Sequence, residues 1–484
     1  MRNTVFDRLN FLRAGAAVVA GGIVGCGGGS GGSGTPPPVP TPVPTAGNVA
    51  AVTIHPAITG TLTSMFVGLS YEKANVSSGL FTSANASLIG CFGRLGTSLL
   101  RFGGNTTDQT TWVGTGSGGV AGQVAPADIN ALATFLAATG WQVLYAINLG
   151  SNTPQNAAAE AAYVIQTLGS SLYAFEIGSQ PDLYGTNGIR PSPYTFSDFL
   201  SEWQTYASQI TAAVPGANLA GPATSSENVQ GWTVPFAPAE ASEITLLTQH
   251  YYRGNGTSAS STTAELLAGD PALLGDFHAL RSAATGAKIS GGYRMAETNS
   301  FSNGGALGVS DAYGSALWAL DYIMIGAENG CAGFNFHGGG DSGGYTPIAD
   351  SNNAVVDVRP EFYALLMVRQ ISPGSVLTVT TDTSLPFTAY AVAGGDGATY
   401  VVLVNKGASE KAVVSVTLPS SFSHGTTLAL AGPNLDGTSG TTLGGAAVAP
   451  NGQWTPLAST PFAIGGTSFQ LDVPAASALL VRCT

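Results

Sequence analysis

Two short segments of the chain end on residues that could carry nucleophilic or acid–base chemistry. The segment Phe175–Asp182, FEIGSQPD, runs from apolar residues into Gly-Ser-Gln-Pro. The segment Tyr293–Thr298, YRMAET, runs from apolar residues to the carboxylate of Glu297. A carboxylate so placed can attack an electrophilic carbon, and a nearby acid can protonate the group that leaves. The amide of Gln180, at the end of the first segment, has no proton to give at neutral pH. One segment thus ends on a carboxylate that could carry such chemistry, and the other ends on an amide that could not donate a proton.

The elements that position these residues form an alternating pattern of strands and helices. Residues 48–354 contain eight short apolar runs, with helical patterns between several of them. This pattern predicts an α/β fold, a (β/α)₈ TIM barrel. A doubly wound open sheet is the alternative, which we disfavour because no Gly-rich phosphate loop follows the first strand. The predicted strands are Met65–Tyr71, Ser98–Phe102, Gln142–Leu149, Tyr173–Ile177, Asn218–Gly221, Leu246–Tyr251, Tyr293–Ala296 and Gly333–Phe336.

Helical spacing recurs between these strands and stops near residue 355. Apolar residues at helical spacing predict helices around 129–136 and over Phe196–Val214, Ala264–Ala284 and Asp311–Ala327. Residues 355–484 instead contain short β-type runs separated by Gly, Asn, Asp and Ser, which predict a C-terminal all-β sandwich. Residues 48–60, with the apolar run Val49–Ile54, could add a strand to it. The predicted sandwich strands are Val376–Val379, Phe387–Val392, Thr399–Asn405, Lys411–Leu418, Thr426–Ala431, Ser468–Val473 and Ala478–Arg482.

The N-terminus has the pattern of a bacterial export signal. Arginines precede an apolar run over 14–24, which is too short to span a bilayer comfortably. Residues 1–26 end in a sequence similar to a lipobox, in which Cys26 would be lipidated; an ordinary signal peptide cleaved elsewhere is the alternative. Residues 27–47 are rich in Gly, Ser and Pro, which predicts a tether. We expect an exported lipoprotein, periplasmic or on the cell surface, that meets the membrane only through its lipid anchor.

Composition limits the partners and cofactors. Only 9% of the 484 residues are charged and the net charge is −12. Because phosphate binding requires clustered Lys and Arg, we expect no nucleic-acid partner. Cys91, Cys331 and Cys483 are odd in number and fit no metal-binding spacing, so buried apolar cysteines are the preferred interpretation. We expect no metal and no organic cofactor, and a monomer.

Polar side chains follow most of the predicted barrel strands. In such barrels the active site lies at the carboxyl ends of the strands, so these residues are expected to converge there. Glu, Arg, His and several Asn at these ends would suit the hydroxyl groups of a sugar. The residues are Ser70-Tyr71-Glu72, Arg101–Asn105, Asn148, Ser179-Gln180, His250–Arg253, Glu297-Thr298-Asn299 and Asn335-Phe336-His337.

Several of these motifs together resemble glycoside hydrolase family 79, which contains β-glucuronidases and heparanase. The resemblance covers about residues 49–484, and the bacterial β-glucuronidases are the most similar branch. It implies a barrel with a β-sandwich and a retaining mechanism on a carbohydrate substrate. The motifs are Gly68–Glu72, Arg101–Asn105, Ile177–Tyr184, His250-Tyr251-Tyr252, Ala296–Asn299 and Gly343–Pro347.

The resemblance also implies roles for individual residues. Glu297 would be the nucleophile, with a second carboxylate about 5 Å away as the acid/base of a retaining enzyme. Arg101 would keep Glu297 ionised, and Tyr252 or Tyr251 would hydrogen-bond to it. A structural ion pair is the alternative role for Glu297.

The substrate's own carboxylate has implied partners as well. The backbone N–H groups of Gly304 and Gly305, with Tyr345, would hold it; a simple turn is the alternative for the two glycines. Glu72 and Asn105 would bind ring hydroxyls, or else satisfy buried backbone groups.

Two residues depart from the family pattern. Gln180 stands where the family has the acid/base Glu, and Ser179 where it has an Asn that binds the sugar. Three interpretations remain open. The protein cleaves glycosides whose aglycones leave unaided; or another carboxylate, of which Asp182 is nearest in sequence, replaces the acid; or the protein is a non-catalytic sugar-binding lipoprotein. For Asp182, capping of the following loop is the preferred alternative.

Overall fold

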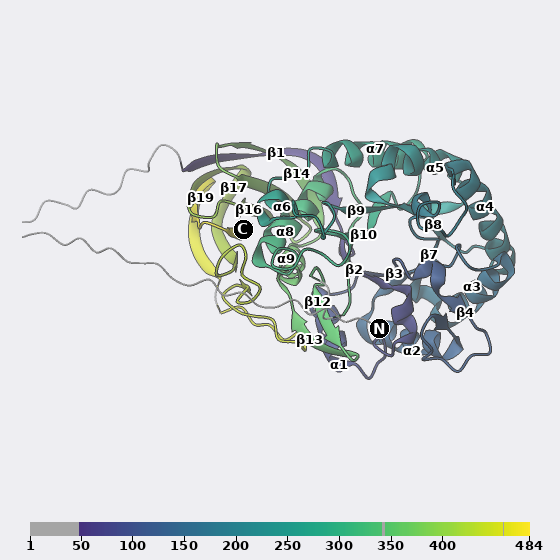
Figure 1. Cartoon of the computed structure of the whole chain (residues 1–484). Coiled ribbons are helices and arrows are strands. Elements are labelled where there is room, and N and C mark those ends of the chain that lie inside the picture. The colour runs from purple at the N-terminus through teal and green to yellow at the C-terminus, as the bar shows by residue number, and fades with distance from the viewer. Residues whose placement is uncertain (1–47, 341–343, 458) are drawn as a thin grey trace, which may run out of the picture. The chain divides into compact units, whose positions relative to one another are not determined.

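The computed structural model describes residues 48–340, 344–457 and 459–484, so the predictions for Cys26, for residues 1–47 and for Gly343 lie outside it. Eight parallel strands close a barrel in the order β10-β11-β2-β3-β6-β7-β8-β9 (Figure 1). The predicted TIM barrel is therefore confirmed, and the open sheet was the wrong alternative. The strands are β2 (Val67–Glu72), β3 (Leu99–Gly103), β6 (Gln142–Ile147), β7 (Leu172–Ile177), β8 (Leu219–Thr224), β9 (Ile244–Tyr252), β10 (Tyr293–Asn299) and β11 (Phe334–Gly338).

The register of the barrel brings polar residues of neighbouring strands to one level. Ser70 of β2 pairs with Arg101 of β3 on one side and with His337 of β11 on the other. Glu297 of β10 pairs with His250 of β9. All five side chains are buried. Parallel pairing thus brings these five polar residues together near the carboxyl ends of their strands, where barrel enzymes have their active sites.

Helices connect the barrel strands, and one of them differs from its prediction. The segment Ala264–Ala284 was expected to form one helix but forms two, α6 (Thr263–Leu267) and α7 (Leu273–Gly286). Gly269, with φ of 78°, and Pro271 separate them, because Gly adopts the left-handed region easily and Pro cannot continue a helix. The other helices are α1 (Ala86–Leu95), α2 (Pro126–Thr139), α3 (Pro154–Leu168), α4 (Phe196–Ala213), α5 (Val234–Ala239) and α8 (Tyr313–Glu328).

A mostly antiparallel eight-stranded sheet follows the barrel and includes the strand that precedes it. The strand β1 (Val49–Leu62) pairs with β14 and, in parallel, with residues 413–417 of β17. The long β17 then pairs with β20 through residues 425–431, so the path of the sheet returns to β1. The sequence predicted two strands where β17 is one. The strands are β14 (Gly374–Asp382), β15 (Phe387–Gly394), β16 (Thr399–Asn405), β17 (Ala412–Ala431), β18 (Thr442–Leu443), β19 (Thr460–Val473) and β20 (Ser477–Cys483).

A further helix, α9 (Pro360–Val368), lies where the sequence predicted that helices had ended. Every one of its residues is buried, and its sequence PEFYALLMV is apolar almost throughout. A helix buried on all sides has no polar face, so the 3.6-residue pattern that reveals surface helices is missing. This helix packs against α8 (Figure 1). It also packs against β17 and β18 of the sheet.

Polar contacts from α8 also join the barrel to the sheet. The carboxylate of Asp321 accepts hydrogen bonds from Thr388 at 2.6 Å and from Tyr390 at 2.5 Å, and Nζ of Lys406 lies 2.7 Å from its other oxygen. These side chains are largely buried. Such a fully paired buried carboxylate fixes one arrangement of helix and sheet, because any other would leave it unpaired.

The three cysteines of the described chain form no disulfide, and its ionisable residues form no metal site. Cys91, Cys331 and Cys483 are free and buried, as expected for apolar cysteines. In residues 48–340, 344–457 and 459–484, no group of His, Cys, Asp and Glu could hold a metal ion. No helix in this part is long and apolar enough to cross a membrane. Two small sheets complete the secondary structure: β4 (Thr111–Trp112) with β5 (Gln123–Val124), and β12 (Ile348–Ser351) with β13 (Ala354–Val358).

Candidate active site

Glu297 lies at the end of β10 with both carboxylate oxygens engaged. The hydroxyl of Tyr252 donates to Oε1 at 2.8 Å, and Nη1 of Arg101 donates to Oε2 at 2.7 Å. Burial alone would raise the pKa of Glu297. The charges of His337 and Arg101, with the Tyr252 hydrogen bond, outweigh burial and hold this pKa well below its ordinary value. Glu297 is therefore ionised at neutral pH, as a nucleophile must be.

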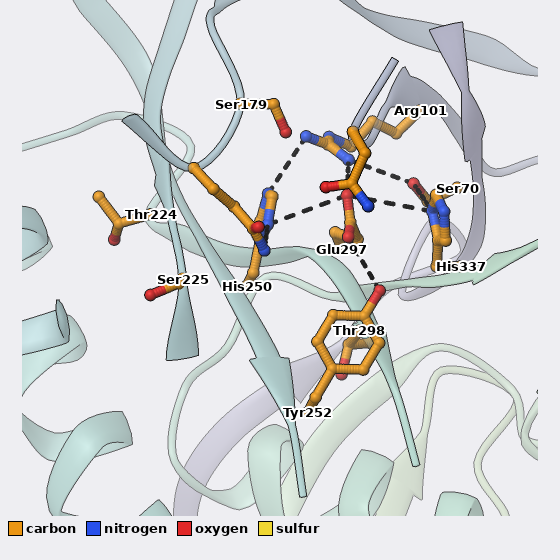
Figure 2. A network of polar contacts seen from close by, with 12 residues as sticks. Ser70, Arg101, Ser179, Thr224, Ser225, His250, Tyr252, Glu297, Thr298 and His337 are labelled. Carbon is orange, nitrogen blue, oxygen red and sulfur yellow. Dashed lines mark hydrogen bonds and ion pairs between the residues drawn. The ribbon is translucent and has the colours of Figure 1, made fainter. Parts of the chain in front are cut away.

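Arg101 is the centre of the network, and its side chain is fully buried. Nε and Nη2 each lie 2.6 Å from Oε2 of Glu176. Nη1 donates to Glu297 and, at 3.3 Å, to Oγ of Ser70, while Nη2 also lies 3.1 Å from Nε2 of His250. Figure 2 shows this guanidinium between Ser70 and His250, with Tyr252 reaching Glu297 from the other side. The sequence predicted the pair of Arg101 and Glu297 but not the second carboxylate.

Glu176 is the residue that sequence reasoning missed. It lies inside β7 between two apolar residues and is fully buried. Burial raises its pKa, although the charge of Arg101 lowers it in part. A lone carboxylate within an apolar strand was the available signal, because a buried charge requires a partner.

His337 connects Glu297 with Glu72 on the opposite side of the site. Its Nδ1 lies 3.0 Å from Oγ of Ser70 and 4.0 Å from Oε2 of Glu297, and its Nε2 lies 3.4 Å from Oε1 of Glu72. Burial lowers the pKa of His337, but the charges of Glu297 and Glu72 raise it above its ordinary value. The ring is thus stabilised as a cation between two carboxylates.

The loop after β3 fixes Glu72. The backbone N–H and the hydroxyl of Thr106 donate to Oε2 at 2.8 and 2.6 Å, and the backbone N–H of Asn105 donates to Oε1 at 3.2 Å. Burial would raise the pKa of Glu72, yet the hydrogen bond and charge of His337 keep it below its ordinary value. The side chain of Asn105 is exposed beside this carboxylate. The structure therefore brings Glu72 and Asn105 together at the site.

Gln180 stands at the end of the β7 segment in a conformation that few residues adopt. Its φ is 49°, in the left-handed region, and its backbone N–H donates to the carbonyl of Ala223 at 2.8 Å. The terminal amide is half-buried, and Nε2 lies 3.2 Å from Nδ1 of His250. Ser179 beside it is buried, and its backbone N–H donates to the buried carboxylate of Asp108. Both residues thus line the site, and the hydrogen bonds of their backbone N–H groups to Asp108 and Ala223 fix their position.

Asp182 does not replace the missing acid. Its oxygens accept from the backbone N–H of Ser225 at 3.0 Å, from the hydroxyl of Ser225 and from Nδ2 of Asn228 at 2.8 Å. Asp182 thus caps the loop after β8, and not, as the alternative interpretation expected, the loop that follows it in the sequence. These contacts argue against Asp182 as the carboxylate of the second interpretation.

Tyr251 lies outside the site, contrary to its predicted role. Its hydroxyl donates to Asp270 at 3.1 Å, and its ring stacks on Tyr322 at a centroid distance of 4.9 Å. Successive side chains of a strand point to opposite faces, so only one of the pair Tyr251 and Tyr252 can reach Glu297. Tyr252 is that residue.

The backbone of Gly305 lies next to the backbone of Tyr345, although the two residues are far apart in the sequence. A Cβ added to Gly305 would lie 3.0 Å from the backbone nitrogen of Tyr345, whose ring is 6.0 Å from that of Tyr252. Gly304 and Gly305 have φ of 83° and 85°, but the N–H of Gly305 donates to the carbonyl of Ser302 at 3.2 Å. One of the two N–H groups expected to hold a substrate carboxylate is therefore already used in a turn.

The curated proteins that are similar to this chain match about half of its length. No protein-family model matches it. The chain is 24% identical over 293 residues to a β-glucuronidase of Aspergillus niger and 24% identical over 280 residues to a β-glucuronidase of Neurospora crassa. These matches cover 52% and 49% of this chain and the same shares of the relatives. The chain thus spans about half the length of the curated relatives it matches.

Solved structures match the fold over most of the chain. A 4-O-α-L-rhamnosyl-β-D-glucuronidase from Fusarium oxysporum, in complex with Rha-GlcA, matches with a TM-score of 0.71 and 20% identity, covering 89% of this chain and 99% of its own. The GH51 arabinofuranosidase from Xanthomonas axonopodis pv. citri matches with a TM-score of 0.65 and 16% identity, covering 90% and 100%. The fold is therefore shared with more than one kind of glycosidase, and the likeness to β-glucuronidases is found in the sequence.

Proposed function

We propose that the protein is a retaining glycoside hydrolase that acts on β-glucuronides or related uronic-acid glycosides. Glu297 is the nucleophile, and no carboxylic acid occupies the usual proton-donor position. The observation that carries the proposal is the geometry of Glu297, which is ionised and held by Arg101 at 2.7 Å and Tyr252 at 2.8 Å. The β-glucuronidase relatives support the choice of substrate class.

The reaction has two steps on the same carboxylate. An oxygen of Glu297 attacks the anomeric carbon, the bond to the aglycone breaks, and its electron pair leaves with the aglycone. Water then attacks the same carbon, the bond to Glu297 breaks, and the proton of the water passes to solvent. A general acid/base typically contributes about 10²–10⁴-fold, and Gln180 cannot supply it. Hence the best substrates carry aglycones that are stable as anions, such as acidic phenols, carboxylates or thiols.

The groups proposed to bind the substrate's carboxylate lie at the edge of the site. Arg101 is a permanent cation, and the pKa of His337 is raised by its two carboxylate neighbours. Tyr345 and Gly305 meet beside them and supply a hydroxyl and a turn at the edge of the site. The hydroxyl of Tyr345 and this turn are the proposed partners of the uronate carboxylate.

A non-catalytic sugar-binding protein is the second candidate, and the presence of Gln180 favours it. A 2-fluoro-β-glucuronide with a dinitrophenolate leaving group separates the two. A hydrolase gives a covalent adduct on Glu297, detected by mass spectrometry of the intact chain and its peptides. A pure binder releases the sugar unchanged, and complete absence of the adduct would contradict the hydrolase proposal.

We also propose that the protein is a monomeric lipoprotein of the bacterial envelope. This rests on the lipobox-like sequence that ends at Cys26. Metabolic labelling with a palmitate analogue should mark the wild-type chain and not Cys26→Ser. Equal labelling of both chains would contradict lipidation at this residue, and size-exclusion chromatography with light scattering tests the monomer.

A further inference from the structure

The amide of Gln180 and the ring of His250 meet in a way that fixes the position of one proton. Nε2 of Gln180 lies 3.2 Å from Nδ1 of His250, and Nη2 of Arg101 lies 3.1 Å from Nε2 of the same ring. Both atoms that face the ring carry hydrogens. A neutral imidazole has one donor and one acceptor, so it cannot accept from both.

Arg101 decides which ring nitrogen accepts. The guanidinium has five N–H groups and no acceptor. Four of them are used by Glu176, Glu297 and Ser70, and the fifth faces Nε2 of His250. Because the side chain is fully buried, leaving this N–H unpaired would cost free energy. Nε2 therefore accepts, and the proton of His250 lies on Nδ1.

Gln180 must then present its amide oxygen to Nδ1. A half-turn of the terminal amide exchanges its oxygen and nitrogen without moving the rest of the side chain. In that orientation Nδ1–H of His250 donates to the oxygen of Gln180, and the NH₂ group turns away from the ring. Within the described residues the terminal amide of Gln180 makes no hydrogen bond other than the one with His250, and it is only half-buried.

We propose that His250 is a positioning residue that turns the NH₂ group of Gln180 toward the leaving atom of the aglycone. Gln180 then donates a hydrogen bond to the departing anion and transfers no proton. Nδ1 of His250 lies 3.9 Å from Oε2 of Glu297, so one ring atom lies next to both the nucleophile and the amide. This inference rests on the proposed function for its catalytic part, whereas the orientation of the amide is independent of turnover.

The orientation is tested on the full chain by NMR with ¹⁵N-labelled histidine. The chain has five histidines, and comparison with His250→Gln assigns the signals of His250. We expect a protonated Nδ1 and an unprotonated Nε2 between pH 6 and 8. A protonated Nε2, with or without a proton on Nδ1, would overturn the orientation even if the protein is only a sugar binder.

The catalytic part is tested with aryl β-glucuronides of graded leaving-group acidity. His250→Gln places its amide near Nε2 and keeps an acceptor for Arg101, while His250→Asn keeps a donor near Nδ1. We expect Gln180→Ala and His250→Gln each to lose about 10-fold in kcat/KM through kcat, the effect of one hydrogen bond to a charged group. His250→Asn should retain most of the activity, and the double variant of Gln180→Ala with His250→Gln should be no worse than either single variant.

Losses that multiply in the double variant would overturn the coupling, since His250 would then act independently of Gln180. Absence of turnover by every protein, with no labelling of Glu297, would overturn the proposed function and the leaving-group role together. The NMR result would still decide the orientation of the amide in that case.

Discussion

Nη1 of Arg101 lies 2.7 Å from Oε2 of Glu297 inside the barrel, where the side chain of Arg101 is fully buried. The same guanidinium contacts Glu176 at 2.6 Å, so one cation is shared by two carboxylates. Burial disfavours all three charges, and their mutual contacts offset its effect together with His337 and Tyr252, which also stabilise the charge of Glu297. The ionised state of Glu297, the proposed nucleophile, therefore depends in part on Arg101.

Arg101→Met should make the activity of the protein sensitive to acid. In the wild type the pKa of Glu297 is held well below its ordinary value, so the fraction of ionised Glu297 stays constant as pH falls from 8 to 5. Without the guanidinium, burial raises this pKa and kcat/KM should decline within that window, in addition to a loss of about 10²-fold at pH 7. The pH profile on 4-nitrophenyl β-glucuronide measures this. If kcat/KM of the variant does not decline between pH 8 and pH 5, Arg101 is not what keeps Glu297 ionised.

Tyr252→Phe should lower kcat/KM about 10-fold, because it removes the hydrogen bond to Oε1 of Glu297. Tyr251→Phe is the matched control from the same strand. It removes the hydrogen bond to Asp270 and should affect stability but leave kcat/KM within about 2-fold. Equal losses of activity in the two variants would contradict the placement of Tyr251 outside the site.

Gln180→Glu should restore a proton donor to the site. We expect a gain of about 10²-fold or more in kcat/KM on alkyl β-glucuronides, whose aglycones need protonation, and a smaller change on the nitrophenyl compound. Azide should accelerate the wild type on the nitrophenyl compound, because a small anion can release the sugar from Glu297 without base assistance. If the variant gains nothing on alkyl substrates, the missing acid is not what limits the wild type.

Residue patterns were enough to predict the barrel, because eight short apolar runs with helical patterns between several of them allow few other arrangements. They failed where a segment is buried on all sides, as in α9, and where Gly269 and Pro271 interrupt a helical pattern. At the site, the resemblance supplied Glu297 and Arg101 as partners. It could not choose between Tyr251 and Tyr252, since the choice depends on which face of β9 turns inward. Nor could it supply the roles of Glu176 and His250, which follow from contacts among four strands.

The three described cysteines should be unreactive in the folded protein. Burial raises the pKa of Cys91 and Cys483 to about 12 and that of Cys331 to about 11, so almost no thiolate exists at pH 8. Ellman's reagent should therefore label none of them in buffer and all three in guanidinium chloride. Rapid labelling of one thiol in the native protein would contradict its burial.

Glu328 should make the stability of the protein depend on pH near neutrality. It lies at the end of α8, where burial and then the charge of Asp321 raise its pKa from 4.5 to about 7. The folded chain therefore holds this proton more tightly than the unfolded chain, and stability falls as pH rises from about 4.5 to 7 and is level above. Glu328→Gln removes this cost, so at pH 8 it should be about 1–3 kcal/mol more stable than wild type, a range that allows for partial screening by solvent. At pH 4 the two proteins should be equally stable.

Urea unfolding across this range measures the difference, and the exposed Glu410→Gln serves as the control, with no expected change. A difference between Glu328→Gln and wild type that stays constant from pH 4 to 8 would show that Glu328 is not the titrating group.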